Sequence, residues 1–235
     1  MTRLISTGPN RAIDGPGCEP GGAIAGNMLL DNAYSKMTCE GNAFQMDAEW
    51  FDLSPETITK APPNVRGWIQ IGQSMTATIG LAAGGPVDVL VKRQEVGPLN
   101  ADEQAFFPID QAATLREVCL SAQGTPLLVA RTVFTSDILR THPQIIHLGT
   151  RHLGSLLFEG EVPSPVTARQ FCHIQPGMPL YDLVRWRHQE KGATYWGRRT
   201  LFWLFSAPLL VTEILLPDLV NSPNADKALR GPDLG

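Results

Sequence analysis

The clearest hydrophobic pattern in the chain lies between Tyr195 and Pro217, where two apolar runs flank a short break. Leu201 to Phe205 is almost wholly apolar, and Leu209 to Leu216 is apolar except for one threonine and one glutamate. Short apolar runs bounded by a turn favour strands over helices. We therefore predict a β-hairpin with residues 206–208 between its strands.

Glu213 is the one acid inside this predicted hairpin. Because side chains alternate between the faces of a strand, it should share a face with Leu209, Val211 and Leu215. Burying a carboxylate unpaired costs several kcal/mol, so such a residue keeps a raised pKa, meets a cation or hydrogen-bonds a polar ligand. Glu213 is thus a candidate site residue, and an acid at a sheet edge that reaches water or pairs with an arginine is the structural alternative.

A second hairpin is predicted from Leu115–Ser121 and Leu127–Phe134, with a turn at Gln123-Gly124. Alternation places Arg116 on the face of the valine and leucine at 118 and 120, which gives a cation in an apolar setting. The alternative is a stem lying on apolar surface with its guanidinium in water. Arg131, on the partner strand, has similar standing.

The remaining pattern predicts short helices between hairpins. Thr76–Leu81 and Val87–Val91 are interpreted as another hairpin, with a turn at Gly84-Gly85. A helix is expected to begin after a Ser54 cap, another covers Pro179–Gln189, and a strand covers Arg169–Ile174. Short helical segments are expected near residues 101–107, 136–139 and 148–158. The predicted fold class is α+β, an antiparallel β-sheet with helices packed on it.

The chain is divided by composition into three parts. Residues 1–46 are rich in glycine and proline with little periodic pattern, so we expect a disordered tail. Residues 47–220 are expected to form a single domain, and residues 221–235 a flexible C-terminus. A chain of 235 residues is long enough for one domain with a substantial core.

Composition and charge exclude several classes of protein. The net charge of −4 and the absence of long Lys/Arg runs argue against a nucleic-acid partner. No apolar stretch reaches the length of a membrane span, and no apolar leader is visible, so we expect a cytoplasmic protein. The four cysteines and five histidines show no ligand spacing, which predicts no metal site.

Five segments, taken in order, resemble the chorismate lyase (chorismate pyruvate-lyase) family. They are RGWIQIGQSMT, VDVLVKRQEV, LREVCLSAQGTPLLVARTVF, HLGSLLF and YWGRRTLFWLFSAPLLVTEILLP, and together they cover roughly Trp68 to Pro217. The resemblance implies an antiparallel sheet with an enclosed ligand site beneath flaps. It also implies a cofactor-free enzyme that converts chorismate to 4-hydroxybenzoate and pyruvate, the first step toward ubiquinone.

The resemblance carries four site residues onto this sequence. Arg116 in the L-R-E strand matches the family's carboxylate-binding arginine, and Glu213 in the T-E pair matches the glutamate that meets the ring hydroxyl. Met75 and Leu153 match two residues whose backbone amides help hold the product carboxylate. Arg116 and Glu213 are therefore the expected catalytic residues, in a protein expected to be a monomer. Whether Glu213 is a general base or only orients the hydroxyl stays open.

Three other readings remain. One is a non-catalytic module of the same fold that binds an aromatic acid, as in the ligand-sensing domains of some transcription regulators. Residues 1–65 lack the winged-helix pattern such a regulator would carry, which counts against it. The others are a lyase that has lost turnover and a lyase for another chorismate-derived acid.

Overall fold

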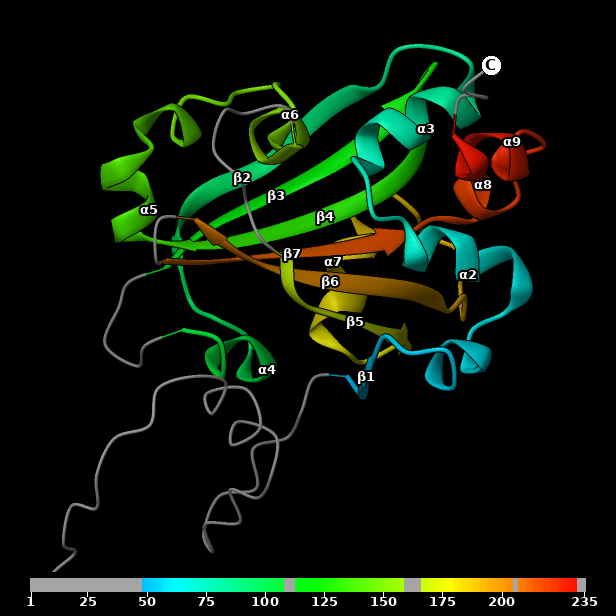
Figure 1. The fold of residues 1–235 in the computed structure, drawn as a ribbon, viewed down its shortest axis with the longest axis horizontal. Helices are drawn as coiled ribbons and strands as arrows, with labels where there is room; N and C mark the ends of the chain where they lie inside the picture. The colour runs from blue at the N-terminus through cyan, green and yellow to red at the C-terminus, as the bar shows by residue number, and fades with distance from the viewer. Residues whose placement is uncertain (1–47, 108–112, 159–165, 205–206, 232–235) are drawn as a thin grey trace, which may run out of the picture. The chain divides into compact units, whose positions relative to one another are not determined.

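A seven-stranded antiparallel sheet forms the centre of the part of the chain that the computed structural model describes, namely residues 48–107, 113–158, 166–204 and 207–231 (Figure 1). The strand order is β1-β5-β6-β7-β4-β3-β2. The strands are β1 Trp50–Asp52, β2 Asp88–Gly97, β3 Ala113–Ala122, β4 Thr125–Thr135, β5 Val166–Ile174, β6 Tyr195–Leu204 and β7 Ala207–Leu215. All neighbouring pairs are antiparallel, so the predicted α+β class with an antiparallel sheet is confirmed.

Short helices connect and cover the strands. They are the 3₁₀ helices η1 Thr57–Lys60 and η2 Pro143–Ile145, and the α-helices α2 Pro63–Gln70, α3 Met75–Ala83, α4 Ala101–Gln104, α5 Ser136–Thr141, α6 Leu153–Phe158, α7 Pro179–Arg185, α8 Pro217–Val220 and α9 Ala225–Arg230. Within the ranges given above, none of them is long and apolar enough to cross a membrane.

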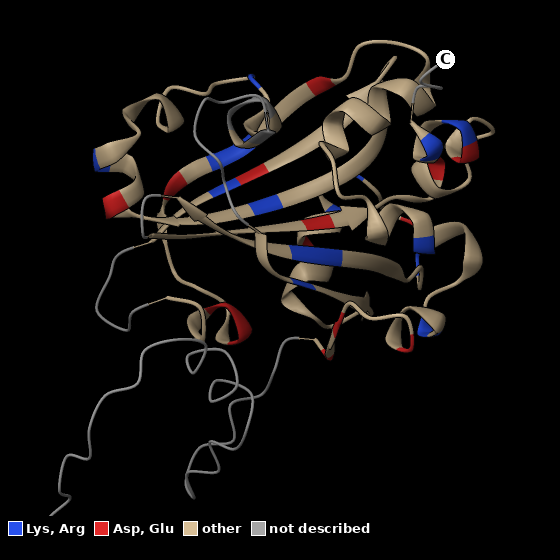
Figure 2. Ribbon diagram, in the orientation of Figure 1, with Lys and Arg blue, Asp and Glu red and all other residues tan. Residues whose placement is uncertain are grey.

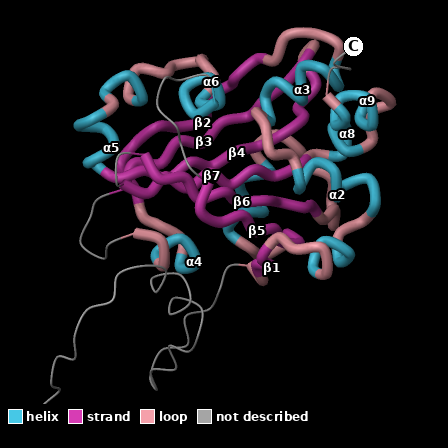
Figure 3. The backbone as a smooth tube through the Cα atoms, in the orientation of Figure 1, coloured by secondary structure: helices cyan, strands magenta, loops and turns pink. Residues whose placement is uncertain are grey.

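Each face of the sheet is covered by its own set of helices (Figures 1 and 3). On one face, α2, α3, α8 and α9 cover one end of the strands, and α5, η2 and α6 cover the other. On the opposite face α7 packs over Val129 and Ile214, and residues following α4 pack over Leu115 and Val133. Apolar side chains therefore fill both faces, and the covering of the first face is divided between two groups of helices.

The hairpin β3–β4 follows from its sequence. Its turn residues Gln123 and Gly124 have φ values of 50° and 82°. A two-residue hairpin turn of type I′ requires positive φ at both positions, which glycine adopts without strain. The predicted turn and the side-chain alternation of both strands are confirmed, with Arg116 opposite Thr132.

The hairpin β6–β7 exists, but its predicted turn is wrong. Ala207 and Pro208 belong to β7, where they pair with Leu204 and Trp203. Strand β6 therefore ends at Leu204 and β7 begins at Ala207, and residues 205 and 206 lie outside the described residues. Because the turn fixes the register of a hairpin, this difference changes every cross-strand neighbour in the pair.

The predicted hairpin around Gly84-Gly85 is wrong in its first half, because Thr76–Leu81 lies in helix α3. The Ser74 side chain accepts a hydrogen bond from the Ala77 N–H and caps the start of this helix. Gly84, with a φ of 66°, ends it in the left-handed conformation that glycine favours. The glycine pair thus ends a helix instead of turning a hairpin, and β2 pairs with β3.

The ends of the domain also differ from expectation. The region after Ser54 forms a 3₁₀ helix of one turn, and the short edge strand β1 precedes it. Residues 221–235 were expected to be flexible, yet they contain α9, whose Ala225 and Ala228 are buried in the core beside α3. The predicted tail, residues 1–46, lies outside the described residues.

Candidate functional site

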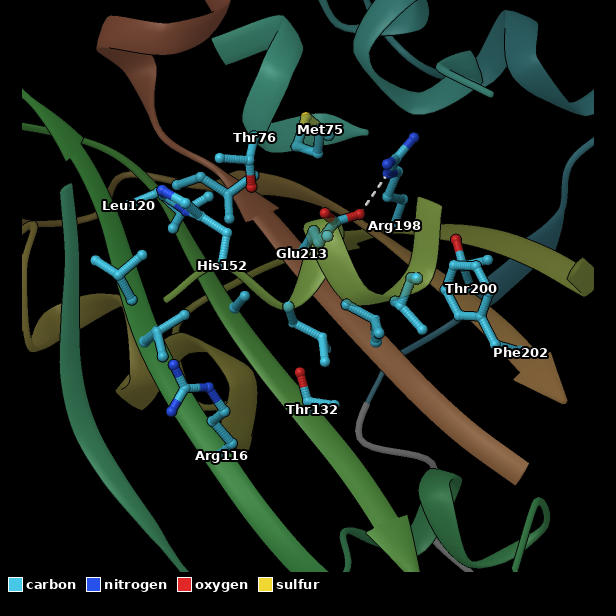
Figure 4. Close-up of a pocket in the computed structure, with 18 of the residues that line it drawn as sticks. Met75, Thr76, Arg116, Leu120, Thr132, His152, Arg198, Thr200, Phe202 and Glu213 are labelled. Carbon is cyan, nitrogen blue, oxygen red and sulfur yellow. Dashed lines mark hydrogen bonds and ion pairs between the residues drawn. The ribbon is translucent and has the colours of Figure 1, made fainter. Parts of the chain in front are cut away.

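A cavity of about 70 Å³ lies between the first face of the sheet and the N-terminal ends of α3 and α6. It is lined by all four of the residues predicted for the site, Met75, Arg116, Leu153 and Glu213. Figure 4 labels three of them, Met75, Arg116 and Glu213. Arg116 comes from β3 and Glu213 from β7, so the two charges approach one space from strands separated by β4. The sheet thus brings together residues that are far apart in the sequence.

Arg116 is buried, with 3% of its surface exposed. Its guanidinium donates to Gln94 Oε1 at 2.7 Å, to the Gly149 carbonyl at 2.8 Å and to the Arg151 carbonyl at 3.3 Å. These bonds use three of its five N–H groups, and no carboxylate among the described residues pairs with it. Burial lowers the pKa of Arg116, since it penalises the charged form. The remaining donors, on Nε and Nη1, are available to an anion.

Two backbone N–H groups lie at the same cavity. Met75 and Leu153 are the first residues of α3 and α6, and the first N–H groups of a helix have no partner within it. The two helix ends are in close contact, because a Cβ atom added at Gly154 would lie 3.0 Å from Ser74 Oγ. The glycine of the L-G pair therefore allows both N–H groups to border one small space.

Glu213 is held by an arginine that sequence analysis did not identify. Arg198 Nε donates to Glu213 Oε2 at 2.7 Å, and both side chains are largely buried (Figure 4). Arg198 Nη1 also bonds carbonyls at the end of α2, including that of Ile71 at 2.8 Å. Glu213 Oε1 has no partner among the residues that the structure describes. The acid is thus fixed by one oxygen and free to meet a ligand with the other.

The floor of the cavity is one row of residues across five strands. The row runs through Arg169, Thr200, Val211, Thr132 and Arg116, each opposite the next in the sheet register. All five line the cavity. Arg169 was not identified from sequence, because its strand was predicted without a face assigned to each side chain. Its guanidinium makes one long hydrogen bond of 3.4 Å, from Nε to Thr200 Oγ1.

Arg131 does not line this cavity, so the prediction that treated it in the same way as Arg116 was wrong. It points to the opposite face, where it bonds Glu103 Oε1 and Glu117 Oε1, each at 2.7 Å. Burial alone would raise the pKa of Glu117, but hydrogen bonds from Arg93 and Arg131 outweigh burial and lower it to about 2. Figure 2 shows charged residues in the middle of several strands. The ion pairs of Arg131 on the face opposite the cavity are structural.

The cysteines in the described ranges are core residues. Cys119 and Cys172 are buried, and burial raises the pKa of both thiols, which disfavours the reactive thiolate. Cys18 and Cys39 lie outside the described residues. No cluster of three His, Cys, Asp or Glu side chains that could hold a metal occurs in the described part of the chain.

These features define a class of site. An apolar cavity with a buried cation, free backbone N–H groups and an oriented carboxylate suits a small organic anion that also carries a hydroxyl. Residues 45–223 match the model of the chorismate lyase family. The chain belongs to that family.

Two similar proteins match most of this chain at the same level of identity. A protein named probable chorismate pyruvate-lyase from Nitrosospira multiformis is 30% identical over 183 residues, 77% of this chain and 98% of that protein. Chorismate pyruvate-lyase from Salmonella arizonae is 30% identical over 69% of this chain and 88% of that protein. Among solved structures, the C-terminal domain of a histidine utilization repressor from Pseudomonas syringae has a TM-score of 0.41 and 9% identity, covering 56% of this chain and 92% of that one. So distant a likeness has no weight for function.

Proposed function

We propose that this protein cleaves chorismate to 4-hydroxybenzoate and pyruvate without a cofactor. The observation that supports this most is the arrangement of Arg116 beside the N–H groups of Met75 and Leu153, with the free oxygen of Glu213 facing the same apolar cavity. A ligand with a carboxylate at one end and a hydroxyl at the other satisfies both groups. Family membership supports the same substrate.

The reaction needs positioning more than it needs a reactive group. The ether bond between the ring and the enolpyruvyl oxygen breaks, and a proton leaves the ring carbon that carries the hydroxyl. The ring becomes aromatic, while the enolpyruvate takes up a proton and tautomerises to pyruvate. The gain in aromaticity drives the reaction, so the protein has to orient the substrate and exclude water.

Each site residue has a role in this proposal. Arg116 and the two backbone N–H groups hold the ring carboxylate through charge-assisted hydrogen bonds. Glu213, kept in place by Arg198, orients the hydroxyl and is our candidate for the group that accepts the ring proton. The groups that contact the ring carboxylate also contact the product, so we expect slow product release that limits turnover. We further propose a cytoplasmic monomer that supplies 4-hydroxybenzoate to ubiquinone synthesis.

Incubation of the purified full chain with chorismate, in EDTA and without added cofactor, tests the proposal. Products are separated by chromatography over time and compared with the uncatalysed background. Equal amounts of 4-hydroxybenzoate and pyruvate, formed well above background, support the lyase. Absence of turnover together with tight binding of 4-hydroxybenzoate by calorimetry would instead support the alternative, a non-catalytic module that binds aromatic acids.

A further inference from the structure

Buried arginines on the two faces of the sheet differ in their partners. On the face opposite the cavity, Arg131 pairs with Glu103 and Glu117, and Arg199 pairs with Asp102. Each of these guanidinium groups has at least one carboxylate within 2.7 Å. A buried charge is costly unless it is paired, and on this face the chain supplies the pairing acids itself.

The cavity face is different. Arg198 pairs with Glu213, but neither Arg116 nor Arg169 has a carboxylate partner among the residues that the structure describes. Counting these buried or half-buried groups gives three positive charges and one negative charge, a surplus of two positive charges. Arg151 also lines the cavity, but this residue is exposed, so water screens its charge. The cavity therefore has the charge to accept a dianion.

The two arginines without acids lie at opposite ends of the row that floors the cavity. Arg116 is on β3 and Arg169 on β5, four strand spacings apart, which is roughly 19 Å between backbones at about 4.8 Å each. Both side chains border the cavity that lies over this row. They leave room for one small molecule with an anionic group at each end.

Arg169 lies at the end of the cavity where the hydroxyl of the ligand is expected. Burial lowers the pKa of Arg169, the nearby Arg198 lowers it further, and Glu213 acts in the opposite direction, so Arg169 lies within electrostatic range of that pair. Thr200 holds its Nε weakly, at 3.4 Å. The other N–H groups of its guanidinium have no partner among the described residues.

Chorismate has two carboxylates, one on the ring and one on the enolpyruvyl group. The ether carbon is next to the hydroxyl carbon, so a ring bound with its carboxylate at Arg116 and its hydroxyl at Glu213 extends the enolpyruvyl group from the Glu213 end. We propose that Arg169 binds the enolpyruvyl carboxylate. This inference rests on the proposed function.

The proposal separates the requirements of the substrate from those of the product. Chorismate engages both Arg116 and Arg169, and its two negative charges balance the surplus in the cavity. After cleavage the second carboxylate leaves with pyruvate, and 4-hydroxybenzoate engages Arg116 alone. Arg169 thus favours substrate over product, whereas Arg116 holds both.

Steady-state kinetics with chorismate and calorimetry with 4-hydroxybenzoate test this separation. Loss of charge-assisted hydrogen bonds predicts that Arg169→Gln raises KM for chorismate about 10- to 100-fold, while Kd for 4-hydroxybenzoate changes less than about threefold. Arg116→Gln should weaken both ligands. Arg140→Gln, which changes an arginine 75% exposed on α5, is the control and should change neither. An unchanged KM in Arg169→Gln, or equal weakening of both ligands, overturns the proposal.

A stable ligand makes the test independent of turnover. In 3-(carboxymethoxy)-4-hydroxybenzoate the second carboxylate is as many bonds from the ring as in chorismate, and no ether cleavage can aromatise it. The Kd ratio of this compound to 4-hydroxybenzoate should rise about 10- to 100-fold in Arg169→Gln, and an unchanged ratio overturns the role of Arg169. If the Kd ratio rises as expected in Arg169→Gln but the wild-type protein does not cleave chorismate, the proposed function fails and the role of Arg169 stands.

If Arg169→Gln does not fold, Arg169→Lys is measured instead. It keeps the charge but loses the planar donors, so a smaller rise, of about threefold or more, is expected and no rise overturns the proposal.

Discussion

Replacing Glu213 by glutamine removes one negative charge from the cavity and keeps an oxygen that Arg198 can still hydrogen-bond. The surplus of positive charge in the cavity increases from two to three, since Arg116, Arg169 and Arg198 are unchanged. A substrate with two carboxylates should therefore bind at least as well as in the wild-type protein. Catalysis should fall, because the free oxygen that meets the hydroxyl is no longer a carboxylate. A fall in kcat without a rise in KM is the expected signature.

The size of the fall distinguishes the two roles left open for this acid. A hydrogen bond to a charged group contributes about 1.5–3 kcal/mol, so loss of orientation alone predicts a fall in kcat of about 10- to 150-fold. Loss of a general base extends to about 10⁴-fold. A fall of more than about 10³-fold therefore assigns proton transfer to Glu213.

Stability gives an independent check on the same variant. The Arg198 side chain is 4% exposed and that of Glu213 12%. Leaving a buried charge unpaired costs about 3–5 kcal/mol, and the retained glutamine oxygen and the carbonyls at the end of α2 reduce this to about 1–3 kcal/mol. For a domain of this size, Tm should fall by about 2–12 °C.

The assay is steady-state kinetics with chorismate, run well below the Tm of the variant. Glu95→Gln is the matched control, since that acid is 58% exposed on β2 and should leave kcat and Tm unchanged. An unaffected kcat in Glu213→Gln, or a rise in KM with kcat unchanged, would refute a role for Glu213 beyond binding.

Three further predictions follow from the same geometry. Arg116→Gln should raise Kd for 4-hydroxybenzoate about 100-fold by calorimetry, and unchanged binding would remove Arg116 from the site. Gly154→Ala places a Cβ atom 3.0 Å from Ser74 Oγ and should separate the ends of α3 and α6, so dissociation of 4-hydroxybenzoate, followed by stopped flow, should accelerate; an equal or slower rate contradicts the close approach. Glu117 has a folded-state pKa of about 2 against an ordinary 4.5, so its contribution of about 3 kcal/mol is present above pH 4.5 and lost as the pH falls toward 2. The urea midpoint of Glu117→Gln should therefore depend less steeply on pH across that window than that of the wild type, and parallel curves would contradict the assignment.

Side-chain alternation was enough to predict strands β3, β4 and β7 and the faces of Arg116 and Glu213. A period of two fixes which residues of β3 and β7 point the same way, so Arg116 and Glu213 could be assigned to apolar faces before any packing was known. Alternation does not say which face of one strand meets which face of another. Arg131 was therefore weighed with Arg116, although the structure places it among acids on the opposite face.

Two errors had local physical causes. Residues 76–81 form a short apolar run, which fits a strand as well as a helix, and the decisive signals were the Ser74 cap and the left-handed Gly84. The partner of Glu213 was missed because a turn at residues 206–208 places it opposite Leu201, whereas the observed register places it opposite Arg198. A hairpin turn displaced by so little changes the cross-strand neighbour of every residue that follows.

The contact between Gly154 and the start of α3 links retention of the ligand to access to the cavity. Met75 and Leu153 begin the two helices that meet there, so any movement that separates these helices also separates the two N–H groups proposed to hold the carboxylate. Opening of the cavity and loss of the two N–H contacts to the carboxylate would then occur in one movement. Substitutions that speed release of the product along this path should also weaken binding of the aromatic acid by the protein. The rate of release and the affinity therefore cannot be adjusted separately at this contact.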